Sequence, residues 1–221
     1  MVQLEDVINQ LQNWNDGKGV ILRSTGNTFC SGGDLTTVRA INNPESGYLM
    51  SSFMHETLTK FYRLPFISVA LVHGKAIGGG AELTTVTDFR VFTKSAEISF
   101  VQAKMGVITG WGGGTRLVKL IGFKNALELL SSCKKINHLE GSNLGLVDHV
   151  VESDSRVEDT QEWLSKRINY DSSVVQAIKK TVISARDNSL DESLTNERSY
   201  FSPLWGGPAN IKALQQNIKH K

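Results

Sequence analysis

The chain has 221 residues, 40% hydrophobic and 21% charged, enough to bury a core in one or two domains. Its 24 basic and 22 acidic residues give a formal charge of only +2, and no basic run is interleaved with aromatic residues, so we expect no nucleic-acid partner. Two distant cysteines without a CxxC pair argue against a disulfide framework or a zinc site. No apolar run approaches the roughly 18 residues of a membrane span. We therefore expect a soluble cytosolic protein with no metal and no membrane partner.

The first third of the chain alternates helical and extended patterns. Apolar spacing predicts a helix from about Leu4 that ends by Gly17, a strand over 19–23 and a polar loop over 24–34. A short helix after residue 35 and a longer one over 46–63 follow. The apolar positions expected on the longer helix are Leu49, Phe53, Leu58 and Phe61.

Residues 66–82, FISVALVHGKAIGGGAE, join an almost unbroken apolar run to a glycine triplet and one carboxylate. The run predicts a strand covered on both faces, as in parallel sheets, and a helix begins near Gly79. Because the first N–H groups of a helix have no internal partner, the triplet can bring a ligand oxygen against them, and Glu82 follows one turn later. The plainer interpretation is a tight turn followed by an acid that complements the helix dipole.

The rest of the chain predicts strands over 89–92, 98–100 and 147–151 and helices from about residues 115 and 156. We therefore expect an α/β core over 1–150 and a helical C-terminal region over 151–221. Between these strands and helices, the glycines of GVITGWGGG fit neither a P-loop nor a dinucleotide fingerprint. The expected apolar positions of the C-terminal helices include Ile178, Val182, Leu190 and Leu194, and a solvated helix face is expected for Lys212, Lys219 and Lys221.

A second glycine-containing loop, FCSGGD at 29–34, also follows a strand and precedes a helix. Two such loops at neighbouring strand ends can direct their N–H groups at one oxygen. Ser31 lies in no GxSxG context, which argues against a serine-hydrolase triad. His73, before the turn at Gly74, is expected to be a hydrogen-bonded structural residue rather than a base.

The segments TFCSGGDL, ALVHGKAIGGGAEL, DFRVFT and GWGGGTRL resemble the crotonase (enoyl-CoA hydratase/isomerase) superfamily in order and spacing, over most of residues 17–150. The resemblance implies an α/β crotonase-like fold with a parallel-rich sheet core and a helical C-terminal region. It also implies a shortened N-terminus with an uncovered sheet edge, because two strands and a CoA-contacting segment normally precede the helix that opens this sequence.

The resemblance implies the site residues too. The family's oxyanion hole, two backbone N–H groups that hold an acyl-CoA thioester oxygen, maps to Gly33 and Gly79, and its first catalytic glutamate maps to Glu82. The second glutamate of the hydratases maps to Gln102, and an amide cannot cycle a proton at neutral pH. The expected substrate-binding residues are Phe29, Ser31, Gly32, Gly78, Gly80, Thr109, Gly110 and Trp111.

Within the family, FVQAKMG, GWGGGTRL, NER and WGGPAN resemble decarboxylases of short branched malonyl-CoA thioesters such as ethylmalonyl-CoA and methylmalonyl-CoA. This implies a carboxy-lyase that uses no cofactor, because coenzyme A is part of the substrate, and that assembles as a homotrimer or a dimer of trimers. Two alternatives are an enoyl-CoA isomerase and a catalytically inactive CoA-binding scaffold, because fold alone does not fix function.

Overall fold

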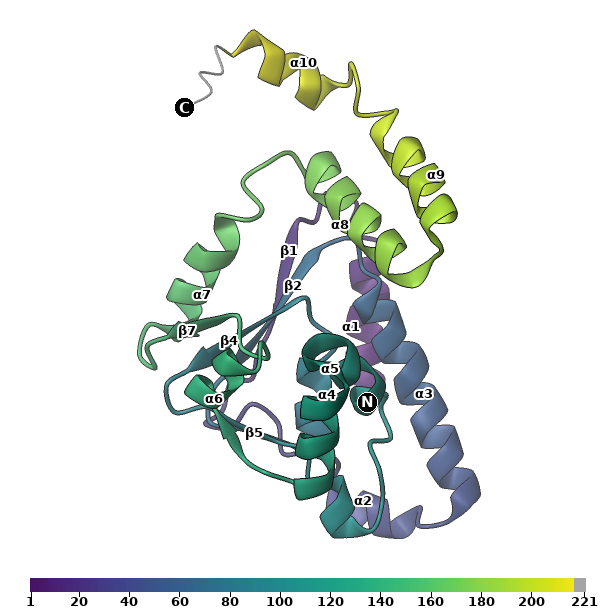
Figure 1. Ribbon diagram of the computed structural model, residues 1–221, viewed down its shortest axis with the longest axis vertical. Coiled ribbons are helices and arrows are strands. Elements are labelled where there is room, and N and C mark those ends of the chain that lie inside the picture. Colours follow the sequence, from purple (N-terminus) through teal and green to yellow (C-terminus); the bar gives the residue numbers. More distant parts are fainter. Residues whose placement is uncertain (217–221) are drawn as a thin grey trace.

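The computed structural model describes residues 1–216 (Figure 1). The strands are β1 (Gly19–Leu22), β2 (Ile67–Val72), β3 (Lys75–Ile77), β4 (Phe89–Thr93), β5 (Glu97–Ser99), β6 (Ile136–Asn137) and β7 (His149–Val151). The helices are α1 (Val2–Gln12), α2 (Leu35–Ala40), α3 (Pro44–Tyr62), α4 (Gly79–Thr84), α5 (Gly113–Ser132), α6 (His138–Asn143), α7 (Arg156–Ser165), α8 (Ser172–Asp187), α9 (Leu190–Phe201) and α10 (Pro208–Gln215), with a short 3-10 helix at Gln102–Met105.

Two sheets form the core. The larger has the strand order β1-β2-β4-β7 with every pair parallel, and the smaller has the order β3-β5-β6 with one parallel and one antiparallel pair. The parallel-rich core is therefore confirmed. Since β1 and β2 run parallel in the register Leu22↔Ala70, the loops that follow them leave the sheet at the same edge.

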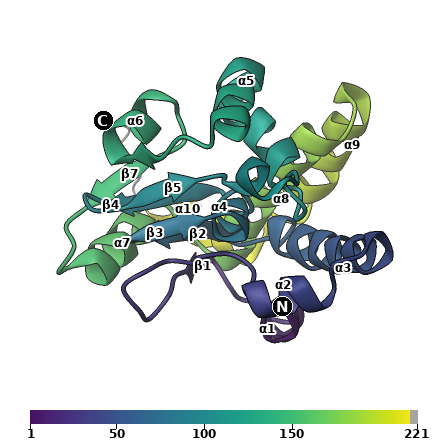
Figure 2. The same ribbon diagram turned by 90° about the horizontal axis from the view of Figure 1, so that it is seen from below.

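Side chains of β2 alternate between two apolar layers. Val69 and Leu71 pack in a cluster with Leu164 of α7, whereas Ala70 and Val72 pack in another with residues of β5 and α5. This period of two is what a strand imposes, and burial on both faces explains the near-continuous apolar run. In Figure 2 the strands lie between α5 and α6 on one side and α1 and α2 on the other.

The smaller sheet was not predicted as a separate unit. Its strands β3 and β6 have three and two residues, too short to give a periodic pattern. β3 is nonetheless important for the site, because the isolated bridge Cys30↔Ala76 joins it to the FCSGGD loop.

Long α3 packs most of its predicted apolar positions against the core. Leu58 and Phe61 are buried, and Phe53 is half-buried against the same cluster, whereas Leu49 is 61% exposed. Met54, which was not predicted, is 1% exposed and lies one turn before Leu58.

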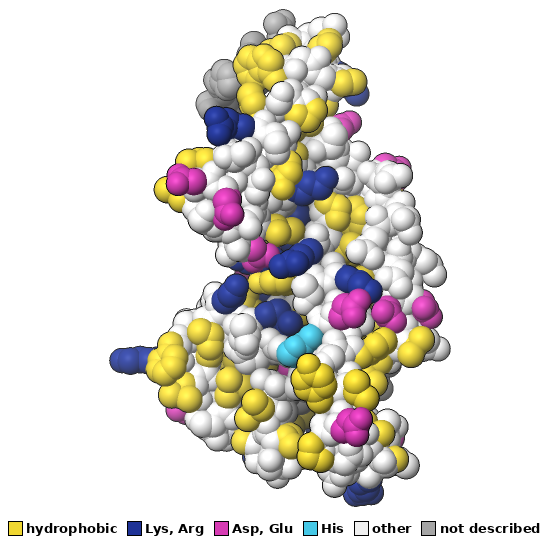
Figure 3. All heavy atoms as spheres, turned by 90° about the vertical axis from the view of Figure 1, so that its right-hand side faces the viewer, with side chains coloured by type: hydrophobic (Ala, Val, Ile, Leu, Met, Phe, Trp, Pro, Cys, Tyr) yellow, Lys and Arg dark blue, Asp and Glu magenta, His cyan; other side chains and the backbone are white. Residues whose placement is uncertain are grey.

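The C-terminal helices extend beyond the sheets as an arm in which α9 and α10 lie farthest out (Figure 1). Leu164 of α7 and Val175 of α8 are buried, whereas other apolar positions of α8 and α9 are exposed within the chain. These are Ile178, Val182, Leu190 and Leu194. Figure 3 shows apolar side chains both at the top of this face and across its lower half. Lys212 lies in α10, while Lys219 and Lys221 lie outside the described residues.

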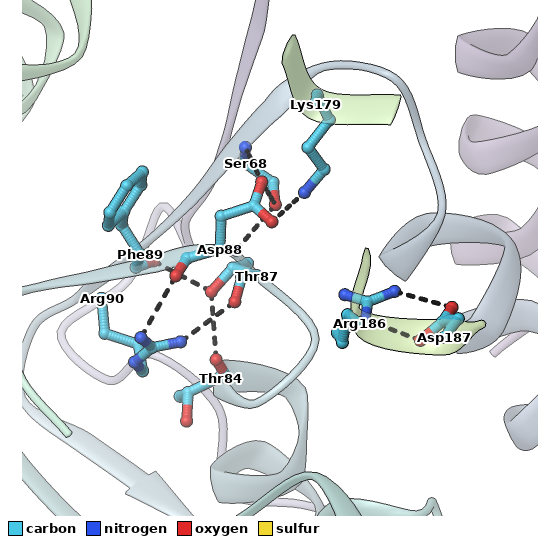
Figure 4. A network of polar contacts seen from close by, with 9 residues as sticks. All are labelled: Ser68, Thr84, Thr87, Asp88, Phe89, Arg90, Lys179, Arg186 and Asp187. Atoms are coloured by element: carbon cyan, nitrogen blue, oxygen red, sulfur yellow. Dashed lines mark hydrogen bonds and ion pairs between the residues drawn. The ribbon is translucent and has the colours of Figure 1, made fainter. Parts of the chain in front are cut away.

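A buried polar network attaches α8 to the core (Figure 4). Asp88 accepts hydrogen bonds from the backbone nitrogen and hydroxyl of Ser68 at 2.7 and 2.8 Å and pairs with Lys179 of α8. Burial lowers the pKa of Lys179 to about 8. Beside this group Arg90 bonds to Asp148 at 2.8 Å. Asp88 thus links β2 and the start of β4 to α8.

We expect Asp88→Ala to lower the free energy of unfolding by about 3 kcal/mol, since it leaves the buried Lys179 charge and two Ser68 donors without a partner. Urea unfolding measures the change. The matched control is Glu152→Ala, which breaks an exposed pair with Lys94 and should cost less than about 0.5 kcal/mol. Equal effects of the two variants would show that Asp88 does not carry the attachment.

Candidate active site

The glycine triplet forms the start of α4 as predicted. Gly78 has φ 58°, a left-handed conformation that favours glycine, and its nitrogen bonds to the Ser99 carbonyl at 2.9 Å. A Cβ atom on Gly80 would lie 2.0 Å from the carbonyl oxygen of Cys30, so only glycine lets α4 approach the FCSGGD loop. Between them, the Gly79 nitrogen donates to no group within residues 1–216. It is an open donor at a helix start.

The FCSGGD loop reaches the same place from β1. Cys30 fixes it to β3, because its nitrogen bonds to Lys75 and its carbonyl accepts from Ile77. Gly32 has φ 93°, and a Cβ atom there would lie 3.1 Å from the Gly79 nitrogen. The Gly33 nitrogen likewise donates to no group in the described part of the chain. The structure therefore brings Gly33 and Gly79 into neighbouring loops, each with an unpaired N–H.

Asp34 ends this loop by capping α2, which turns the chain away from the two glycines. Its Oδ1 accepts from the Thr37 nitrogen at 2.8 Å. This backbone hydrogen bond lowers the pKa of Asp34. The carboxylate is thus engaged with its own helix rather than with Gly33.

Glu82 is 2% exposed, and four donors surround its carboxylate. Oε2 accepts from the Trp111 and Gly113 nitrogens at 2.8 Å each, and Oε1 accepts from Gln102 Nε2 at 2.9 Å and from the Gly110 nitrogen at 3.3 Å. A Cβ atom on Gly113 would lie 2.4 Å from Glu82 Cγ, so this glycine permits the close approach. The sequence predicted Glu82 near the oxyanion donors, but gave no sign that it binds the loop some thirty residues later.

Gln102 points its amide nitrogen at Glu82, as it must, because a carboxylate can only accept. Its Oε1 is buried and has no hydrogen-bond partner among the described residues. The structure thus brings Gln102 and Glu82 together, with the amide N–H already engaged by Glu82.

Each polar group of Trp111 makes a hydrogen bond. Besides its nitrogen on Glu82, its carbonyl accepts from Arg116 at 2.6 Å, and its indole Nε1 donates to the sulfur of Met50 at 3.1 Å. Burial lowers the pKa of Arg116, while the charge of Glu82 opposes that effect. The six-membered ring lies against Gly79, where an added Cβ would come within 2.6 Å of Cζ3.

A cavity of about 490 Å³ opens beside these groups. Gly32, Gly33, Cys30 and Trp111 line it, and most of its remaining wall is apolar. That wall consists of Met1, Leu4, Val38, Ile41, Met50, Met54 and Leu83, with Asp34 and Thr37 at the polar side. Of the two glycines with open N–H groups, Gly33 lines the cavity, and Gly79 lies against the Trp111 ring that forms part of its wall.

The other predicted site residues take different places. Phe29 is 7% exposed and belongs to the core, and Ser31 is exposed beside Gly32. Thr109 accepts from the Gly114 nitrogen at 3.1 Å, which shapes the loop before α5. His73 is hydrogen-bonded as predicted, to the Gly26 carbonyl at 2.7 Å.

Sequence reasoning missed the contribution of α3. Met50 and Met54 line the cavity from one face of this helix, one turn apart. Their four-residue spacing, continued by Leu58, was the available signal.

Among the described residues, no three His, Cys, Asp or Glu side chains are placed to hold a metal ion, and both cysteines are free. No helix within residues 1–216 combines the length and the apolarity needed to cross a membrane.

The enoyl-CoA hydratase/isomerase family model matches residues 1–206. The ethylmalonyl-CoA decarboxylase of Danio rerio is 49% identical over 225 residues, covering 100% of this chain and 74% of that protein, and that of Mus musculus is 48% identical over 223 residues, covering 100% and 69%. An enoyl-CoA hydratase structure from Bacillus anthracis superposes with a TM-score of 0.89 at 28% identity, covering 96% of this chain and 83% of that one. One from Thermoplasma volcanium gives 0.84 at 28%, covering 98% and 86%. With a family model over nearly its whole length and two glycine loops in the arrangement described above, the chain belongs to the enoyl-CoA hydratase/isomerase, or crotonase, family.

Proposed function

We propose that the chain decarboxylates short branched malonyl-CoA thioesters, with ethylmalonyl-CoA and methylmalonyl-CoA as substrates. The observation that carries the proposal is the pair of unpaired N–H groups, on Gly33 and Gly79, beside an apolar cavity. The full-length similarity to ethylmalonyl-CoA decarboxylases supports the choice of substrate.

Loss of CO2 needs charge stabilisation more than proton transfer. The bond between Cα and the carboxylate carbon breaks, its electron pair moves toward the thioester oxygen, and an enolate forms. Two N–H groups directed at that oxygen stabilise the enolate. A proton then reaches Cα, so ethylmalonyl-CoA gives CO2 and butyryl-CoA. Coenzyme A enters and leaves as part of the substrate, and the reaction needs no further cofactor.

Gln102 and Glu82 favour this chemistry over water addition. Hydration by two carboxylates requires both groups to cycle protons, but one of the two positions holds an amide. The remaining carboxylate accepts four hydrogen bonds, which also disfavours its use as the base of an isomerase. The uncharged Gln102 adds no second negative charge beside Glu82, so this position does not repel the substrate's own carboxylate.

The test compares ethylmalonyl-CoA, labelled with 14C in its free carboxylate, with crotonyl-CoA. We expect release of labelled CO2 from the first and no loss of enoyl absorbance from the second. Robust hydration of crotonyl-CoA would replace the proposal with a hydratase. Tight binding of both thioesters without turnover would identify a CoA-binding scaffold.

We also propose a homotrimer or a dimer of trimers. The support is the apolar surface of the C-terminal arm, where Leu190, Trp205 and Leu214 are each more than 70% exposed in the single chain. Such a surface is commonly covered in an assembly. Sedimentation equilibrium measures the stoichiometry of the assembly. A stable monomer at micromolar concentration would contradict the proposed trimer.

For the cellular location we propose the cytosol. The support is that Cys30 and Cys133 are both free, as thiols are in a reducing compartment. Fractionation with an antibody against the native protein tests it, and recovery with an organelle fraction would count against it.

A further inference from the structure

The loop at 109–113 is held from two helices at once. From α4, Glu82 binds the backbone nitrogens of Gly110 and Trp111. From α3, the Ser51 hydroxyl donates to the Gly110 carbonyl at 2.6 Å, and Met50 accepts the indole N–H of Trp111 at 3.1 Å. Consecutive residues of α3 therefore bind consecutive residues of the loop.

This arrangement fixes the plane of the indole. The ring edge bearing Nε1 is tied to Met50, and the six-membered ring is in contact with Gly79. Trp111 and Met50 both line the 490 Å³ cavity. A thioether is a weak acceptor on a flexible chain, so Met50 can meet the indole without adding a charge or a strongly hydrated group to the cavity wall.

We propose that Met50 and Ser51 are positioning residues that determine which α-substituent the site accepts. They act through Trp111: by fixing the indole beside Gly79, they set the room next to the thioester oxygen that Gly33 and Gly79 hold. The selectivity part of this inference rests on the proposed decarboxylation. A fixed wall distinguishes an ethyl from a butyl branch, whereas a wall free to rotate admits both.

Met50→Leu keeps the volume of the side chain and removes the acceptor. We expect the ratio of kcat/KM for ethylmalonyl-CoA over butylmalonyl-CoA to fall by roughly tenfold, the scale on which apolar pockets discriminate methylenes. Ser51→Ala should lower the same ratio, whereas Ser51→Thr, which keeps the hydroxyl, should retain the wild-type ratio. In a Trp111→Phe background, Met50→Leu should have no further effect, because the indole N–H through which it acts is gone. The matched control is Met105→Leu, the same change on a side chain 53% exposed and outside the cavity.

The position of the indole is measured directly by 19F NMR of protein labelled with 5-fluorotryptophan. The chain has four tryptophans, and the Trp111→Phe spectrum identifies the resonance of Trp111. Met50→Leu and Ser51→Ala should shift or broaden that resonance and leave those of Trp14, Trp163 and Trp205 in place, while Met105→Leu should change none.

The two readouts separate this inference from the proposed function. If the wild type releases no CO2 from either substrate, the proposed decarboxylation fails, and the 19F spectra decide whether Met50 and Ser51 position Trp111. If the wild type is active but Met50→Leu retains both its selectivity and its Trp111 resonance, the positioning role is overturned. Additive effects of Met50→Leu and Trp111→Phe on selectivity would also overturn it.

Discussion

Gly79→Ala should lower kcat/KM for decarboxylation of ethylmalonyl-CoA by roughly a hundredfold or more, the loss that follows removal of one oxyanion donor, about 3 kcal/mol. The added Cβ would lie 2.6 to 3.0 Å from three atoms of the Trp111 ring. That ring cannot withdraw freely, because its indole N–H, backbone N–H and carbonyl are all bonded. The helix start must therefore shift and carry the Gly79 N–H away from the thioester oxygen.

The effect should fall mainly on kcat, because the developing enolate uses the donor more than the bound thioester does. Gly47→Ala is the matched control: it lies in α3, has nothing within 4 Å of its added Cβ, and should leave turnover unchanged. Thermal unfolding of both variants checks that they fold. Full turnover by a folded Gly79→Ala protein would remove Gly79 from the oxyanion hole.

The position of the two glycine loops could be predicted from the sequence because local signals and topology agree there. An apolar run without alternation indicated a parallel strand, and each glycine pair follows a strand and precedes a helix. The parallel strands β1 and β2 end at one sheet edge, and β3, whose Ala76 pairs with Cys30, then brings Gly79 beside the FCSGGD loop. The pairing was predictable although the loops are more than forty residues apart.

The role of Glu82 in holding the loop could not be predicted in the same way. Its partners at Gly110, Trp111 and Gly113 are backbone nitrogens, and a backbone nitrogen has no signature in a sequence. The glycine at 113 gave a hint, because it is the position where Glu82 Cγ leaves no room for a side chain. A glycine-rich loop indicates close approach without naming the group that approaches.

The buried face of α3 was predicted incompletely for a different reason. Phe53, Leu58 and Phe61 pack in the core as their spacing suggests, but Leu49 is exposed and Met50 and Met54 join the buried face. Only packing against the rest of the core and the cavity decides which apolar residues at the margin of the face are covered. The exposed apolar positions of α9 and α10 illustrate the same limit, because a periodic pattern marks a face to be covered without saying what covers it.

Gln102→Glu should reduce decarboxylation at neutral pH by about a hundredfold or more. The substitution replaces an N–H donor 2.9 Å from Glu82 Oε1 with a second carboxylate. Two unit charges about 4 Å apart cost roughly 4 kcal/mol at an effective dielectric constant of 20. The introduced carboxylate opposes both Glu82 and the carboxylate of the substrate, and it weakens the anchor on which the 110–113 loop depends.

The pH dependence distinguishes this charge effect from simple damage. Two carboxyl groups that share a site cannot both ionise easily, so the pair's higher apparent pKa is raised above that of an isolated glutamate. Below that pKa the introduced group is neutral and can donate to Glu82, as the amide does now. Activity of Gln102→Glu should therefore recover as the pH falls through this pKa, relative to wild type at the same pH.

Gln102→Met, which loses the hydrogen bond without gaining a charge, should lose less activity and show no such recovery. Full decarboxylation by Gln102→Glu at neutral pH would mean that an uncharged side chain at this position is not required. Equal losses of activity in Gln102→Glu and Gln102→Met, independent of pH, would assign the effect to the hydrogen bond with Glu82 alone.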